Sequence, residues 1–242
     1  MAIMPRKQRQ NDELRPIEIR RRFTRAAPGS VLIRCGNTHV FCTASILEGV
    51  PGWREASDHG WLTAEYDMLP GATSDRRPRN RTKIDGRTQE IQRLIGRSLR
   101  AVVDMSQLGS YTINLDCDVI QADGGTRTTA ITGAYVALHD ALATGRERGL
   151  WSGGVLRAGV AAVSVGLVEG ETLLDLDYSE DVAADVDCNL VLTSEGRWVE
   201  VQATGEHTTY SDDDLARMTE LGRRGIERLF KLQQASLQDS TT

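Results

Sequence analysis

The alternation of hydrophobic and polar positions predicts β-strands in several parts of the chain. The segment GSVLIRCGNTHVFCTASIL, residues 29–47, is rich in β-branched residues and is interrupted by Gly36 and Asn37. This pattern is typical of a β-hairpin. Further strands are expected at 111–121 and near 158–168, 172–177, 186–193 and 197–203.

Apolar positions follow the helical period in three other segments. The first helix is expected from Thr88 to about Leu108, and the second directly after the glycine pair Gly124–Gly125. A C-terminal helix should begin after Ser211, because Asp214 stands three residues further on in a capping-box arrangement. Residues 236–242 are expected to be a frayed tail.

Residues 48–87 contain much Gly, Pro and Arg and are predicted to form a long basic connection. The sequence contains no internal repeat, and no obvious linker divides it. We therefore expect one compact α/β domain of the α+β type over residues 1–242, with mixed sheets packed against helices and its core at about 10–235.

The composition is that of an ordinary globular protein, with 40% hydrophobic and 26% charged residues. No apolar run follows the charged N-terminal residues, and no eighteen-residue apolar segment occurs, so neither a signal peptide nor a membrane span is expected. The default compartment is the cytoplasm. The cysteines show no CxxC pairing and are interpreted as reduced core residues: Cys35, Cys42, Cys117 and Cys188.

The net charge of -5 hides a strong asymmetry along the chain. Residues 1–25 carry eight basic and three acidic side chains, and residues 76–100 carry nine basic and two acidic ones. Most of these cations are Arg, whose planar fork suits phosphate oxygens. The clustering favours a polyphosphate partner, although a bias towards Arg explains the Arg-to-Lys ratio equally well.

Two features point to an anion site. In GGTRTT the glycines permit a tight turn into a helix whose free N–H groups favour an anion, and Thr126 and Arg127 add a hydroxyl and a fork. Arg87 stands at the N-terminal edge of the first helix, where a cation opposes the helix dipole and calls for an anion. A bound phosphate would supply it; a salt bridge to Asp85 or Glu90 is the alternative.

The segment DLDYSEDVAADVDCN, residues 175–189, is unusually acidic. No Lys or Arg lies between Arg157 and Arg197, so no nearby residue in the sequence neutralises its charges. Converging carboxylates would repel one another unless a cation binds, and hard oxygen ligands select Mg²⁺ or Mn²⁺. Some of the acidic residues must simply face solvent: Asp175, Asp177, Glu180, Asp181, Asp185 and Asp187. Asp181 is expected in a turn between two strands.

Together, these features describe a phosphoryl-transfer site acting on nucleic acid. No Ser/His or Cys/His arrangement offers a protein nucleophile. The attacking group should therefore be a bound small molecule, either water or phosphate.

Longer blocks of the sequence resemble the ribonuclease PH family of phosphorolytic 3′-to-5′ exoribonucleases, which trim tRNA ends. The resemblance spans roughly residues 10–235 and rests on NDELRPIEI, GSVLIRCGNTHVFCTAS, GWLTAEYDMLP, GRTQEIQRLIGRSLRAVVD, DCDVIQADGGTRTTAITGAYVAL, DLDYSEDVAADVDCN and EVQATGEHTTYS. It implies a fold like the second domain of ribosomal protein S5 and a homohexameric ring built as a trimer of dimers.

The resemblance also implies roles for individual residues. Inorganic phosphate, the co-substrate, would be held by Arg87, Gly125, Thr126 and Arg127. The catalytic Mg²⁺, or Mn²⁺, would be held by Asp181 and Asp187. The body of the tRNA would be gripped by Arg76, Arg77, Arg79, Arg81 and Lys83.

The implied reaction is attack by phosphate on the last phosphodiester of an RNA 3′ end, which releases a nucleoside 5′-diphosphate and is reversible. The chain departs from the family pattern at Ala203 and Gly205, which are exchanged, at His207, and in the loop 71–84. Competing interpretations are a hydrolytic nuclease, a kinase, and a non-catalytic RNA-binding ring subunit of the exosome type.

Overall fold

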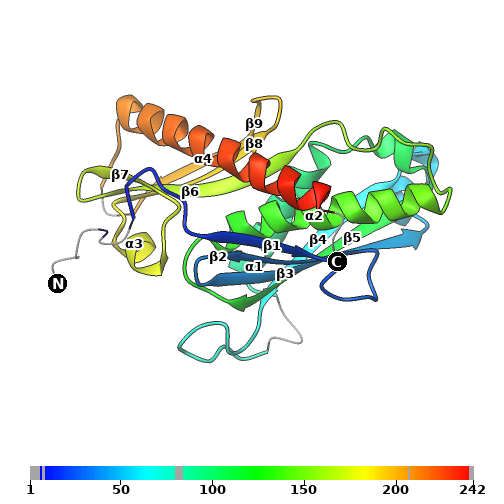
Figure 1. The fold of residues 1–242 in the computed structure, drawn as a ribbon, viewed down its shortest axis with the longest axis horizontal. Helices are drawn as coiled ribbons and strands as arrows, with labels where there is room; N and C mark the ends of the chain where they lie inside the picture. Colours follow the sequence, from blue (N-terminus) through cyan, green and yellow to red (C-terminus); the bar gives the residue numbers. More distant parts are fainter. Residues whose placement is uncertain (1–5, 7–8, 80–83, 207, 240–242) are drawn as a thin grey trace.

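The computed structural model describes residues 6, 9–79, 84–206 and 208–239. Two β-sheets and the helices packed on them form the mixed α/β fold that the sequence predicts (Figure 1). The strands are β1 (Ile17–Arg21), β2 (Gly29–Cys35), β3 (Thr38–Glu48), β4 (Trp61–Met68), β5 (Tyr111–Gln121), β6 (Val160–Val168), β7 (Glu171–Leu174), β8 (Val186–Thr193) and β9 (Trp198–Gly205). The helices are α1 (Gly86–Arg100), α2 (Thr126–Glu147), α3 (Tyr178–Ala183) and α4 (Asp212–Gln238), with short 3₁₀ helices η1 (Gly52–Ser57) and η2 (Met105–Leu108).

The larger sheet has the strand order β1-β2-β3-β5-β4, and β4 pairs with β5 in parallel whereas the other pairs are antiparallel. The predicted hairpin of β2 and β3 is present, and Gly36 at its turn has a φ of +56°, which favours glycine. Side chains alternate along each strand: Val40, Cys42 and Leu115 point into the core against α1 and α2.

The smaller sheet has the order β7-β6-β8-β9, and its strands match the predicted segments closely. Helix α2 packs against strands of both sheets, and α4 crosses β6 (Figure 1). Buried Gln233 of α4 ties these layers together, because its amide donates to the carbonyl oxygens of Thr132 in α2 (3.0 Å) and Val160 in β6 (3.1 Å). Helix α2 thus packs against both sheets and connects their cores.

Two predicted segments needed correction. The connection 48–87 is no continuous loop, because β4 lies within it; Leu62, Ala64 and Tyr66 point inward while Glu65 and Asp67 face outward. The first helix begins at Gly86 and ends at Arg100 rather than near Leu108. It stops because the chain turns into an isolated β-bridge between Val103 and Leu156, although Val102 and Val103 continue the apolar period.

The C-terminal helix begins as predicted, with Ser211 and Asp214 in a reciprocal capping box. The tail prediction was wrong for residues 236–238, because α4 continues to Gln238. Arg21 holds this end by donating to the carbonyl oxygens of Ser236 (2.9 Å) and Leu237 (3.2 Å). The predicted free, buried cysteines are confirmed. None of the helices described is both long and apolar enough to span a bilayer.

Candidate active site

A cavity of about 680 Å³ opens where the ends of β4 and β5 meet the start of α2, α3 and β8. The strand ends contribute Met68 and Ala122, and β6 contributes Ser164. Every residue expected to hold phosphate or metal lines this one cavity: Arg87, Gly125, Thr126, Arg127, Asp181 and Asp187. Residues that are as much as one hundred positions apart in the sequence therefore face a common space.

The glycine pair before α2 forms one wall of the cavity. Gly124 and Gly125 have φ values of +71° and +62°, and a Cβ on Gly124 would lie 2.5 Å from the carbonyl oxygen of Leu176. Glycine is required there because the chain passes so close to this carbonyl. Gly125 is the N-cap of α2 and provides no capping side chain, so the first N–H groups of the helix remain available to an anion.

Tyr66 fixes the hydroxyl of Thr126 beside these N–H groups. The buried Tyr66 hydroxyl donates a hydrogen bond of 2.8 Å to Thr126 Oγ1. Burial raises the pKa of Tyr66, so the phenol stays protonated as the donor. Because Oγ1 accepts from Tyr66, the proton of the Thr126 hydroxyl is free to be donated into the cavity.

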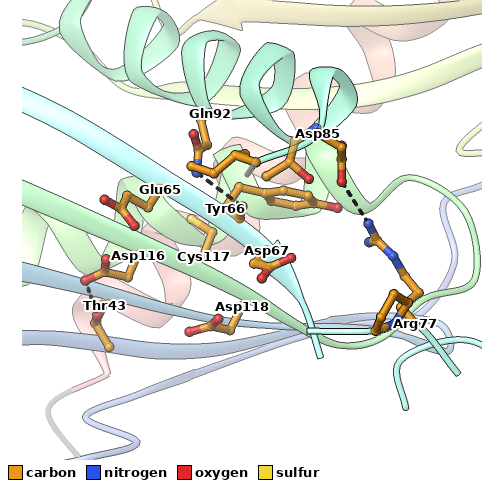
Figure 2. Close-up of a pocket in the computed structure, with 13 residues that line it drawn as sticks. Thr43, Glu65, Tyr66, Asp67, Arg77, Asp85, Gln92, Asp116, Cys117 and Asp118 are labelled. Atoms are coloured by element: carbon orange, nitrogen blue, oxygen red, sulfur yellow. Dashed lines mark hydrogen bonds and ion pairs between the residues drawn. The ribbon is translucent and has the colours of Figure 1, made fainter. Parts of the chain in front are cut away.

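The two arginines approach the cavity from α1 and α2. Arg127 Nη1 lies 3.4 Å from a carboxylate oxygen of Glu90 and 3.3 Å from Gln202 Oε1, which orient its side chain. The alternative partners for Arg87 are engaged elsewhere: Asp85 caps α1 and pairs with Arg77 at 3.2 Å (Figure 2). Within the described residues no ion pair joins Arg87 to Asp85 or Glu90.

Asp181 and Asp187 line the same cavity as the two arginines. Burial, followed by the charge of Asp181, raises the pKa of Asp187 to about 6. Burial also raises the pKa of Asp181, although Arg87 and Arg127 oppose this shift. Asn189 Nδ2 donates to Asp187 Oδ2 at 3.0 Å, whereas Oδ1 is buried without a hydrogen-bond partner among the described residues. Two nearby carboxylates with an unsatisfied oxygen are a donor set that suits a hard divalent cation.

Three other carboxylates of the acidic segment have structural roles. Asp175 is buried and forms a two-point ion pair with Arg15, with distances of 2.7 and 3.0 Å. Glu180 pairs with Arg6 (2.6 Å) and Arg9 (3.0 Å). No residue nearby in the sequence neutralises these two carboxylates, as expected; their cations come from the basic N-terminal residues, which fold against them.

A capping box of Asp177 and Glu180 begins α3. Asp177 accepts from the backbone N–H of Glu180 and is the N-cap of α3. Asp181 therefore lies within a short helix, and the expectation of a turn between strands was wrong. The capping box holds Asp181 in the second half of α3, where its side chain faces the cavity.

The basic loop is only partly described. Arg76 and Arg79 are exposed, as expected for residues that contact a large RNA. Arg77 differs, because it lines the cavity and pairs with Asp85. Arg81 and Lys83, together with His207, lie outside the described residues.

Several cavity residues were not anticipated. Tyr66 and Asn189 position predicted residues through hydrogen bonds, and Glu206 adds a further carboxylate near Asp181 and Asp187. Strand alternation alone would have directed Tyr66 inward.

Gly205, one of the positions at which the chain departs from the family pattern, cannot be replaced without a shift of the chain, since a Cβ would lie 2.0 Å from the Thr208 carbonyl oxygen.

Comparison with known proteins identifies the family. Residues 13–143 match domain 1 of the 3′ exoribonuclease family, and residues 159–225 match domain 2. The chain belongs to this family. Its relatives include the ribonuclease PH of Corynebacterium diphtheriae, 54% identical over 94% of this chain and 95% of the relative. That of a Synechococcus strain is 54% identical over 93% of both chains.

Family membership also decides the activity. The function expected from the sequence, phosphorolytic 3′-to-5′ degradation of RNA, is confirmed at this level. The fold agrees with a solved chain of the Archaeoglobus fulgidus exosome with RNA bound to its active site, with a TM-score of 0.77 and 20% identity. The alignment covers 92% of this chain and 90% of that chain.

Proposed function

We propose that this exoribonuclease trims the 3′ ends of tRNA precursors in the cytoplasm and that the cavity described above is its active site. The observation that carries the proposal is the convergence of Arg87, Arg127, the open N-terminus of α2, Asp181 and Asp187 on one cavity. Such a cavity offers donors and cations to a bound anion and carboxylates to a cation. This is the arrangement that phosphoryl transfer requires.

The phosphate binds at the start of α2 in this proposal. Backbone N–H groups and the Thr126 hydroxyl donate to its oxygens, and the forks of Arg87 and Arg127 bind its remaining charge. Held in this way, one phosphate oxygen is directed at the phosphorus of the last phosphodiester of the RNA. Pre-orientation of this kind can lower the activation free energy of attack by several kcal/mol. Phosphate can therefore outcompete water, although water is present at a much higher concentration.

The chemical step exchanges one phosphorus–oxygen bond for another. A bond forms between the attacking phosphate oxygen and the terminal phosphorus, while the bond to the 3′ oxygen of the preceding nucleotide breaks. That 3′ oxygen takes up the proton that the attacking hydrogen phosphate loses and becomes the hydroxyl of the new RNA end, and the released product is a nucleoside 5′-diphosphate. Because one phosphoanhydride replaces one phosphodiester, the reaction is reversible and also adds nucleotides to RNA 3′ ends.

Asp181 and Asp187 would hold a Mg²⁺ or Mn²⁺ ion. Two observations support this proposal: Oδ1 of Asp187 has no hydrogen-bond partner among the described residues, and the pKa of its carboxyl is raised. A bound cation would accept the lone pairs of Oδ1 and stabilise the ionised carboxylate. When bound, the ion would offset negative charge on the scissile phosphate. Asn189 orients Asp187 through its hydrogen bond to Oδ2.

The body of the tRNA would contact the basic loop through its phosphates, without base readout. Exposed Arg76 and Arg79 support this part of the proposal. We further propose that about residues 10–235 form a single domain, which the packing of α2 against both sheets supports. We also propose that six chains assemble as a trimer of dimers.

The phosphate site is tested with Arg127→Lys, which keeps the positive charge and loses the two-point grip. We expect the KM for phosphate to rise on the order of tenfold or more, with the KM for a short RNA nearly unchanged. Arg146→Lys, on the far end of α2, is a matched control. An equal rise in both KM values would contradict the assignment of Arg127 to phosphate.

A further inference from the structure

Two segments that are far apart in the sequence meet at the edge of the active-site cavity. One is the turn of Asp123, Gly124 and Gly125 before α2, where the proposed phosphate site lies; we call it the phosphate turn. The other is α3, which carries the proposed metal ligand Asp181. A displacement of about 1 Å between groups that act in one reaction can cost on the order of a hundredfold in rate. The contacts that hold these two segments together therefore matter for activity.

The side chain of Asp123 joins the two segments directly. Its Oδ1 accepts a hydrogen bond of 3.2 Å from the backbone N–H of Tyr178, which is the first residue of α3. Its Oδ2 accepts a hydrogen bond of 3.1 Å from Nδ2 of Asn37, in the turn between β2 and β3. A carboxylate suits this place because both neighbours are donors. It connects the phosphate turn, the start of α3 and the β2–β3 hairpin.

The backbone of the phosphate turn is held by a separate set of contacts. The buried hydroxyl of Thr38 donates to the carbonyl oxygen of Gly124 (2.6 Å) and accepts from the N–H of Asp123 (2.9 Å). Arg15 donates from Nη1 to the carbonyl oxygen of Asp123. These contacts use none of the side-chain oxygens of Asp123. They should therefore survive when its carboxylate is removed.

The start of α3 also has contacts of its own, which hold it to a different part of the chain. Asp177 accepts from the N–H of Glu180, and the carboxylate of Glu180 pairs with arginines of the N-terminal segment. Among the side-chain hydrogen bonds of the described residues, the one between Asp123 and Tyr178 joins α3 to the phosphate turn. Without it, α3 stays attached to the N-terminal segment and loses this direct tie to the turn.

We propose that Asp123 is a positioning residue for phosphorolysis, whose carboxylate holds the start of α3 against the phosphate turn and so sets where Asp181 stands relative to the bound phosphate. Asp181 lies three residues after Tyr178 in the same short helix, so the two move together. Asp123 itself is not among the described residues that line the cavity, and it acts through α3. The inference rests on the phosphate and metal assignments proposed above.

The proposal predicts that the two halves of the site respond differently to Asp123→Ala. The variant frees the start of α3, but Thr38 and Arg15 still hold the phosphate turn. We expect kcat to fall on the order of tenfold or more and the half-saturating Mg²⁺ concentration to rise. The Kd for inorganic phosphate, measured by calorimetry without metal, should stay within about twofold of the wild type because the turn is intact.

Asp123→Asn tests whether the hydrogen bonds, and not the charge, do the positioning. Its amide oxygen can still accept from Tyr178, and exposed Asn37 can turn its own amide to accept from the new Nδ2. This variant should keep most of the wild-type kcat. Asn37→Ala removes only the donor to Oδ2, from an exposed turn, and should show the pattern of Asp123→Ala to a smaller extent.

Asp104→Ala is the matched control for the loss of a helix-capping carboxylate. Asp104 accepts from the N–H of Ser106 at the start of η2 (3.1 Å) and does not line the cavity. It should leave both kcat and the Mg²⁺ requirement unchanged. Thermal melting checks that every variant is folded, and the rise in melting temperature on adding Mg²⁺ should be smaller for Asp123→Ala than for the wild type and Asp104→Ala.

Three results would overturn the proposal. One is a wild-type kcat and Mg²⁺ requirement in both Asp123→Ala and Asn37→Ala; another is an equal loss in Asp123→Asn and Asp123→Ala. The third is a phosphate Kd that rises as much as kcat falls, because the phosphate turn and not α3 would then have moved. A wild type that binds no phosphate and needs no divalent cation would overturn the proposed site as well, which separates that failure from the other three.

Discussion

Asn189 donates a hydrogen bond of 3.0 Å to one carboxylate oxygen of Asp187 and leaves the other oxygen buried without a hydrogen-bond partner among the described residues. Such an atom costs free energy unless something binds it. Asp187 also has the negative charge of Asp181 nearby, and none of the described Lys or Arg side chains forms an ion pair with it. Burial and charge repulsion therefore disfavour the ionised form of Asp187, and a divalent cation bound there would offset both.

The first prediction concerns stability without metal. Burial and the charge of Asp181 raise the pKa of Asp187 to about 6. The free energy of unfolding of the metal-free protein should therefore fall as the pH rises from about 4 through 6, where Asp187 ionises in the folded state. Below about pH 4 the carboxyl is protonated in both states and this cost disappears. Asp187→Asn should therefore stabilise the metal-free protein at pH 8, by roughly 1 to 3 kcal/mol. Denaturant melts with chelator at pH 5 and pH 8 measure the difference.

The same variant should respond less to metal. Adding Mg²⁺ should raise the melting temperature of the wild type and of Asp185→Asn, because Asp185 is not among the residues that line the cavity. It should leave Asp187→Asn nearly unchanged. An Asp187→Asn protein that is less stable than wild type without metal, yet gains as much from Mg²⁺, would contradict the assignment.

A second prediction concerns turnover. Asp181→Asn and Asp187→Asn should each lower kcat by a factor on the order of a hundred or more, because each removes a proposed metal ligand. Asp185→Asn should change kcat little. Single-turnover assays on a short RNA at saturating Mg²⁺ separate these cases, and near-normal rates for both ligand variants would refute the metal site.

A third prediction separates structural from functional carboxylates. Burial alone would raise the pKa of Asp175, but Arg15 and Arg9 outweigh it and hold this pKa below its usual value. Its stabilising effect should be full at neutral pH and disappear as the pH falls below about 4 towards the folded-state pKa. Asp175→Asn should cost about 3 to 5 kcal/mol at pH 7, since Arg15 stays buried without its partner.

Denaturant titration at pH 7 and pH 3 checks this prediction. The difference in unfolding free energy between wild type and Asp175→Asn should be large at pH 7 and smaller at pH 3. The exposed pair of Arg34 and Glu18 is a control, because removing it should cost less than about 1 kcal/mol at either pH. A difference for Asp175→Asn that is independent of pH would mean that lost packing, and no ion pair, explains its cost.

A fourth prediction divides the basic loop. Replacing exposed Arg76 and Arg79 by Ala should weaken tRNA binding and reduce its salt dependence, but spare cleavage of a short oligonucleotide. Arg77→Ala should impair both substrates, because Arg77 lines the cavity. The comparison needs KM values for both RNAs at two salt concentrations. Equal losses on the short substrate for the two sets would show that the loop acts as one unit.

Much of the fold could be predicted because local patterns agree with the final structure. The hairpin at Gly36 and the capping box of Ser211 and Asp214 depend on residues close in sequence, and both were found. Strand β4 was missed because its outer residues Glu65 and Asp67 and the surrounding Gly and Pro resemble a loop. The end of α1 was misjudged because a distant pairing, Val103 with Leu156, overrides the local period.

The candidate site shows the same division. GGTRTT by itself predicts the glycine turn and the helix start on which the proposed anion site depends, since both are local features. The roles of the acidic residues are not set locally: Asp175 and Glu180 are paired with arginines of the N-terminal segment, which lie 160 to 174 positions away in the sequence. Without the fold, nothing in the sequence distinguishes these carboxylates from Asp181 and Asp187.

The central claim is that the cavity binds phosphate as the attacking group, and product analysis tests it most directly. An RNA with a free 3′ end is incubated with the enzyme and Mg²⁺, with and without added phosphate, and the released nucleotides are separated. The account predicts an intact RNA without phosphate, and shortening with release of nucleoside 5′-diphosphates once phosphate is added. Nucleoside monophosphates released in phosphate-free buffer would mean that water attacks, and would contradict the account.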